Sequence, residues 1–140
     1  MYFHTHIKPR NFYDIYTWQI SAKLKRIDIY IKTNMKGISA SKAAALLEIS
    51  EQEVRHIMEL LSIKKIHIKN FFEIMQRGSS ELCRYMMREA ILGFPHVYTM
   101  NEVAYIYGLD IDDVFEASRI TGIKEATAAT LPVLFCHIPA

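Results

Sequence analysis

Three side chains that can contact nucleic-acid bases stand at helical spacing between residues 50 and 60. Gln52, Arg55 and His56 occupy positions i, i+3 and i+4, so a helix there carries them on one face. Glutamine can pair with adenine and arginine with guanine, each through two hydrogen bonds. Lysines before and after this stretch suit backbone phosphates, and a serine is placed to cap the helix. The candidate DNA-binding residues are therefore Lys42, Ser50, Gln52, Arg55, His56, Lys64, Lys65 and Lys69.

Residues 39–64 supply the expected scaffold for this site, two short helices joined by a tight turn. Ala44 is small enough for the two helices to cross closely, and Val54 fills the corner between them. Ser50 with Glu53 predicts the capped start of the second helix. Glu48 stands where such a turn favours glycine, so we expect the turn to be strained or to take another geometry.

A related stretch follows sixty residues later, at residues 99–124. Its Ala104, Gly108 and Val114 match the small residue, the turn and the corner of the first stretch. The identical pairs at this offset are Ala44/Ala104, Val54/Val114, Ile63/Ile123 and Lys64/Lys124, and the expected helix caps are Thr99 with Glu102 and Asp110 with Asp113. We interpret the two stretches as a degenerate tandem repeat. The alternative is two unrelated amphipathic helix pairs.

The second stretch is acidic where the first carries base-contacting residues. Its second helix contains one basic residue, Arg119, and the acidic residues Asp110, Asp112, Asp113 and Glu116. Phosphates repel carboxylates, which also forfeit the free energy of counterion release. We therefore expect this unit to pack against the first, to form a homodimer or to bind a protein partner, and not to enter a DNA groove.

The N-terminal third predicts an irregular arm over residues 1–10 and then a long basic helix. Apolar residues at three- and four-residue steps predict that the helix begins at Asn11 and stops at Gly37. Residues 26–32 alternate like a strand, which is the competing interpretation of that segment. The helical pattern is longer, so we expect a helix.

The segments around the two helix pairs predict further short elements. Residues 66–68 indicate a stunted wing that would place lysines beside phosphates, and Asn70 with Glu73 indicates the cap of the next helix. Residues 80–92 predict a spacer helix. The apolar tail, residues 125–140, is expected to form a strand or to cover the core.

The whole pattern predicts a mostly all-α chain. It contains two helix-turn-helix units as a degenerate tandem repeat, a long N-terminal helix and at most short wing strands. The expected divisions, within one compact domain, are 1–37 (arm and basic helix), 38–78 (first unit with its wing), 79–97 (spacer helix) and 98–140 (acidic second unit and apolar tail).

Composition and charge exclude several classes of protein. Hydrophobic residues make up 51% of the 140, which suffices for a core, and no apolar run approaches the ~18 residues of a membrane span. Residues 1–37 carry seven basic and two acidic residues, whereas residues 99–140 carry two and six. A polyanion would therefore meet the first half. With two cysteines and no metal-ligand spacing, phosphate-cradling glycine loop or nucleophile motif, we expect a cytoplasmic protein without metal, cofactor or enzymatic activity.

Residues 39–77 resemble the helix-turn-helix domains of excisionases and MerR-like regulators. The matching residues are Ala44 in the first helix, Ser50, Val54 and Arg55 in the second, Ile68 to Asn70 with Lys69 in the wing, and Phe71, Phe72 and Met75 in the helix after it. The resemblance covers under a third of the chain. It implies DNA binding, often in the setting of a phage or mobile element.

Two functions remain open at this stage. The first is a small DNA-binding protein, a transcriptional regulator or recombination accessory factor, that binds double-stranded DNA as a homodimer or with a partner. The second is a helical protein–protein interaction adaptor that keeps the helix-turn-helix shape without binding DNA. The acidic second unit favours the adaptor, as do Glu51 and Glu59 beside the base-contacting residues.

Overall fold

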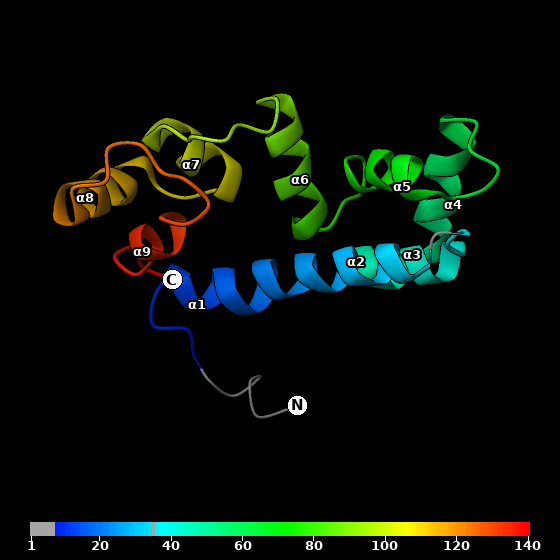
Figure 1. The fold of residues 1–140 in the computed structure, drawn as a ribbon, viewed down its shortest axis with the longest axis horizontal. Coiled ribbons are helices and arrows are strands. Elements are labelled where there is room, and N and C mark those ends of the chain that lie inside the picture. Colours follow the sequence, from blue (N-terminus) through cyan, green and yellow to red (C-terminus); the bar gives the residue numbers. More distant parts are fainter. Residues whose placement is uncertain (1–7, 35) are drawn as a thin grey trace. The chain divides into compact units, whose positions relative to one another are not determined.

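The computed structural model describes residues 8–34 and 36–140, and this part of the chain is α-helical without a β-strand (Figure 1). Its helices are α1 Phe12–Ile15, the π-helical η2 Tyr16–Ser21, α2 Ala22–Thr33, α3 Ala40–Leu47, α4 Glu51–Leu60, α5 Ile68–Met75, α6 Glu81–Ile91, α7 Met100–Tyr107, α8 Ile111–Thr121 and α9 Leu131–Phe135. The all-α prediction is confirmed. The predicted arm, residues 1–10, lies mostly outside the described residues.

The N-terminal helix starts at its predicted cap. Asn11 Oδ1 accepts a hydrogen bond of 3.3 Å from the backbone amide of Asp14. Residues 26–32 are helical, so the strand interpretation of their alternation is wrong. The helical period places Ile27 and Ile31 on the same buried face, and burial of that face outweighs the local strand pattern.

The same helix ends earlier than the sequence predicts, at Thr33 and not at Gly37. The side-chain amide of Asn34 donates a hydrogen bond of 2.9 Å to the carbonyl of Tyr30 and so satisfies one of the last helical acceptors. Residues 16–21 form a π-helical turn that no pattern in the sequence predicts.

Contacts divide the chain into two compact units. The basic unit is Lys23–Phe94 and contains thirteen Lys and Arg against eight Asp and Glu. The acidic unit joins the residues up to Ala22 to Pro95–Ala140 and contains four against seven. The sequence suggests one compact domain with its first division after residue 37, whereas the contacts group most of α2 with the helices that follow it. Each unit contains one helix-turn-helix pair and its own buried apolar residues.

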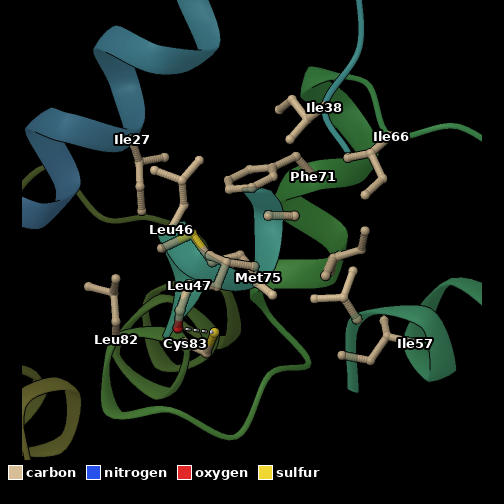
Figure 2. Packing of buried hydrophobic residues seen from close by; sticks show 14 of the residues in the cluster. Ile27, Ile38, Leu46, Leu47, Ile57, Ile66, Phe71, Met75, Leu82 and Cys83 are labelled. Carbon is tan, nitrogen blue, oxygen red and sulfur yellow. Dashed lines mark hydrogen bonds between the residues drawn. The ribbon is translucent and has the colours of Figure 1, made fainter. Parts of the chain in front are cut away.

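The core of the basic unit forms where α2, α3, α4, α5 and α6 meet (Figure 2). Leu47, Phe71 and Met75 are completely buried there. Ile38 and Ile66 are buried beside this core and form an antiparallel β-bridge. The thiol of Cys83 lies 3.9 Å from the carbonyl oxygen of Leu47, and burial raises the pKa of this thiol.

The core of the acidic unit is aromatic. The ring centroid of Phe135 in α9 lies 4.8 Å from that of Phe12, 4.9 Å from that of Tyr16 and 5.1 Å from that of Tyr107. These edge-to-face and tilted contacts are favourable geometries for aromatic pairs. The sequence predicts a tail that forms a strand or covers the core. It covers the core, and it does so as the helix α9.

The predicted repeat is confirmed and extends from residues 38–75 to residues 98–135. α3 and α7 are offset by sixty residues, and the caps of α4 and α8 are too. Burial follows the same offset, and the buried pairs include Ile38/Tyr98, Ala43/Val103, Ala44/Ala104, Leu47/Tyr107, Val54/Val114, Ile66/Ala126, Phe71/Leu131, Ile74/Leu134 and Met75/Phe135. The second bridge, Tyr98 with Ala126, repeats the first. Two unrelated helix pairs would not share buried positions and bridges along this length.

The turn after the first helix of each pair has the same left-handed backbone in both units. Glu48 has φ 61° and ψ 40°, and Gly108 has φ 64° and ψ 38°. In each turn the next residue's amide donates to the carbonyl of the small residue, Ala44 at 3.1 Å and Ala104 at 3.0 Å. Glu48 therefore takes the geometry of glycine at a strain of about 1 kcal/mol. Its carboxylate forms an ion pair of 2.7 Å with Lys23.

The predicted wing is reduced to a single bridged residue. Ile66 pairs with Ile38 in an isolated β-bridge. Ile68 already belongs to α5, so this helix begins before its predicted cap at Asn70. The side-chain oxygen of Asn70 accepts from the His67 amide at 2.5 Å, and its side-chain nitrogen donates to the Lys65 carbonyl at 2.8 Å. The N-cap of α5 is therefore His67, three residues before the predicted Asn70.

The caps of the acidic unit form as predicted at α7 and in part at α8. Thr99 and Glu102 make both bonds of a capping box, at 3.2 and 2.8 Å. Asp110 accepts from the backbone amides of Asp112 and Asp113 at 2.8 and 3.3 Å, without a returning bond from a side chain.

Candidate nucleic-acid interface

The outer face of α4 carries the three side chains predicted to contact bases. Gln52, Arg55 and His56 are exposed, while Val54 and Ile57 point into the core. The burial pattern of an amphipathic helix therefore holds all three on the solvent side. A helix presented in this way has the shape needed to enter a major groove.

Ser50 is the N-cap of α4. Its Oγ accepts a hydrogen bond of 3.0 Å from the Glu53 amide. The carboxylate of Glu53 does not return to Ser50 but accepts from the amide and hydroxyl of Ser79, at 2.7 and 2.8 Å. The predicted reciprocal capping pair is therefore wrong in its second half. Glu53 instead ties the first turn of α4 to the start of α6, a contact without a local sequence signal.

Arg55 is held by a carboxylate on its own helix. Its Nη2 lies 2.6 Å and its Nε 3.0 Å from Oε2 of Glu51, one turn earlier. Both side chains are largely exposed, and such surface ion pairs contribute about 0–1 kcal/mol. Arg55 can therefore exchange Glu51 for a guanine edge at small cost, although Glu51 itself would face the phosphates.

Lys42 is exposed in the first turn of α3 and is oriented by an aromatic ring. Its Nζ lies 4.9 Å from the ring centroid of Tyr30 in α2. An exposed cation–π contact of this kind contributes about 0.5–1 kcal/mol and leaves the ammonium accessible. The sequence reasoning missed Tyr30, which it considered only as part of the alternating segment 26–32.

Lys64 and Lys65 are exposed in the loop after α4, and Lys69 is exposed in the first turn of α5. The side chain of Lys65 packs against Gly37, because a Cβ on Gly37 would lie only 2.9 Å from Lys65 Cε. The backbone of Gly37 has φ +144°, which favours glycine. Beside this lysine, Lys36 and Gly37 help line a hollow of about 360 Å³ at the end of α2. Gly37 therefore leaves room for the side chain of Lys65, a candidate phosphate contact. The sequence predicts only that Gly37 ends the helix.

The acidic unit has lost this set of side chains at the equivalent positions. Glutamine, arginine and histidine on α4 are replaced on α8 by aspartate, phenylalanine and glutamate. The lysines are replaced by acidic or neutral residues with one exception. The exchanged pairs are Gln52/Asp112, Arg55/Phe115, His56/Glu116, Lys42/Glu102, Lys65/Glu125 and Lys69/Ala129, and the retained one is Lys64/Lys124. The candidate interface belongs to the basic unit alone.

Other site chemistry is sparse in the described residues. Residues 8–34 and 36–140 bring no three potential metal ligands among His, Cys, Asp and Glu together. Cys83 is buried and Cys136 is exposed, and both are free thiols. In the same part of the chain, no helix combines the length and apolarity that crossing a bilayer requires.

Comparison of the chain with protein-family models, with curated proteins and with solved structures found no match.

Proposed function

We propose that the protein binds double-stranded DNA through the basic unit, with α4 as the recognition helix in the major groove. The observation that carries the proposal is the exposed row of Gln52, Arg55 and His56 on a helix whose opposite face is buried. In a groove, Gln52 would pair with adenine and Arg55 with guanine.

Exposed lysines support the proposal because they flank the recognition helix on separate segments. Lys42 lies in α3, Lys64 and Lys65 in the loop after α4, and Lys69 in α5. Basic side chains on several segments beside a recognition helix can contact backbone phosphates and fix the orientation of the helix in a groove. The excess of thirteen basic over eight acidic residues in the unit adds long-range attraction.

The affinity of one such unit is expected to be low, and this favours a dimer. Glu51 and Glu59 lie on or beside the base-facing side of α4 and oppose the phosphates. Two linked units gain affinity because the second binding event becomes intramolecular. We therefore propose a homodimer, acting in the cytoplasm as a transcriptional regulator or recombination accessory factor. The resemblance to excisionases and MerR-like regulators suggests a phage or mobile element as its setting.

The salt dependence of duplex binding tests this function. Fluorescence anisotropy with a labelled random duplex pool is expected to show binding at low salt, with log K falling linearly against log salt concentration. Lys64→Ala and Lys65→Ala are each expected to reduce the slope by about 1. Lys124→Ala, the matched substitution in the acidic unit, is expected to leave the slope unchanged. Absence of binding to any duplex at low salt would refute the proposal.

A second function, a protein–protein interaction adaptor, is favoured by one observation. The helix of the acidic unit that matches α4 exposes Phe115 where α4 exposes Arg55, between carboxylates that repel DNA. The two functions differ in what Arg55→Ala changes. Under DNA recognition by α4 it lowers duplex affinity, and under the adaptor function through Phe115 it leaves partner binding unchanged.

A further inference from the structure

The acidic unit exposes an apolar surface on the outer face of α8. Phe115 and Ile120 are 49% and 51% exposed. Asp112, three residues before Phe115, lies on the same helical face and is exposed. Its carboxylate makes no ion pair or hydrogen bond among the described residues, whereas Glu116 is occupied by Arg119 at 2.6 Å. The face thus combines a protruding aromatic ring with an unneutralised negative charge.

The basic unit carries an apolar groove formed by the ends of α4 and α5 and by α6. The groove has a volume of about 630 Å³, and its lining includes Leu60, Arg77, Met87 and Ile91. Leu60 and Ile91 are 67% and 64% exposed, which is high for aliphatic side chains. Arg77 is exposed and has no ion pair in the described part of the chain. A second hollow of about 360 Å³ adjoins through Gln76.

We propose that α8 of one copy of the protein docks into this groove of a second copy. A convex helical face with an exposed ring fits a concave apolar groove, as in other helix-in-groove contacts. Phe115 would enter between Leu60 and Ile91, with Asp112 facing Arg77. The two surfaces are also matched in charge, because the groove lies in the basic unit and α8 in the acidic one, and this favours their encounter.

The contact is heterologous, since a different surface is used on each copy. Two copies close into the proposed homodimer when each docks its α8 into the groove of the other, so that both contacts are used. The alternative, groove against groove, would bring the two Arg77 side chains together and leave Phe115 uncovered. The inference rests on the proposed self-association and specifies its surfaces, but it does not depend on DNA binding.

Light scattering without nucleic acid tests self-association first. The weight-average mass of the wild-type protein is expected to rise above the monomer value of 16.3 kDa with concentration, up to about 300 μM, and to fall when salt is added. A monomer at every concentration overturns both this inference and the proposed dimer.

Paired variants test the two surfaces. Phe115→Ser and Leu60→Ser are each expected to weaken association at least tenfold, and their equimolar mixture is expected to form a complex of twice the monomer mass. Asp112→Lys and Arg77→Glu are each expected to weaken association, and the double variant to restore it. Arg84→Glu, a charge reversal on α6 outside the groove, is the control without effect.

The same variants separate this docking mode from other modes of self-association. If the wild type associates and Phe115→Ser associates equally well, α8 is not the docking helix and the inference is overturned. If the mixture of Phe115→Ser and Leu60→Ser stays monomeric, the contact is not heterologous and the inference is overturned as well. All four residues are exposed, so circular dichroism is expected to be unchanged in every variant.

Discussion

The two units of this chain use one scaffold to present opposite surfaces. Their buried residues repeat at an offset of sixty, from Ile38/Tyr98 to Met75/Phe135, and their turns share one left-handed geometry. Their exposed residues diverge, with Arg55 against Phe115 and Lys65 against Glu125. The comparison teaches that small and apolar residues specify this fold, and that the exposed positions can change in charge and polarity without changing it.

Truncation of core side chains is expected to have the largest effects on stability, and it tests whether equivalent buried positions contribute equally to the two units. Phe71→Ala is expected to lower the free energy of unfolding of the basic unit by about 3–5 kcal/mol, and Leu131→Ala that of the acidic unit by about 2–5 kcal/mol, because each leaves a cavity in a fully packed site. Hydrogen exchange measured by mass spectrometry resolves the two units separately. A truncation without effect on its own unit would show that the two positions are not equivalent.

Substitution at the base-contacting position is expected to have the next largest effect. Arg55→Ala is expected to weaken binding to a selected DNA site by about 5- to 150-fold, since a bidentate arginine contributes about 1–3 kcal/mol of discrimination. Lys124→Ala, which removes an exposed basic side chain of the acidic unit, is the control. Competition titrations against mismatched sites measure both. Equal losses for the two variants would contradict the assignment of DNA recognition to the basic unit.

Exchanging the turn residues is expected to change stability by about 1 kcal/mol, in opposite directions. Glu48→Gly removes the backbone strain of a left-handed glutamate and is expected to stabilise the basic unit. The gain is reduced by the loss of the exposed ion pair between Glu48 and Lys23. Gly108→Glu introduces the same strain and is expected to destabilise the acidic unit. Urea denaturation monitored by Trp18, which lies in the acidic unit, follows the second variant. Stabilisation by Gly108→Glu would show that the two turns are not alike.

Local rules in the sequence predict the helices, and tertiary contacts decide the rest. The cap at Asn11 and the exposed face of α4 follow from spacing and residue type, because they depend on neighbours within one or two turns. The repeat follows from a comparison of residue types at an offset of sixty. Three features could not be predicted in this way. Glu53 binds Ser79, Lys65 lies over Gly37, and the ring of Phe12 packs against that of Phe135. Each joins residues far apart in the chain, so neither periodicity nor capping preference reports it.

The candidate site divides in the same manner. Gln52, Arg55 and His56 could be placed on one face from their spacing alone. The ion pair that occupies Arg55 and the ring that orients Lys42 could not, because both depend on side-chain positions in the folded chain. The acidic composition of α8 could be read from the sequence, and it marks the difference in charge between the two units.

Hydrogen exchange of the full chain, with and without a saturating DNA duplex, tests most directly the claim that only the basic unit contacts nucleic acid. The account predicts slower exchange of the backbone amides of residues 51–65 when the duplex is present, with unchanged exchange at the equivalent residues 111–125. Protection of residues 111–125, or unchanged exchange in both segments at saturation, would contradict it.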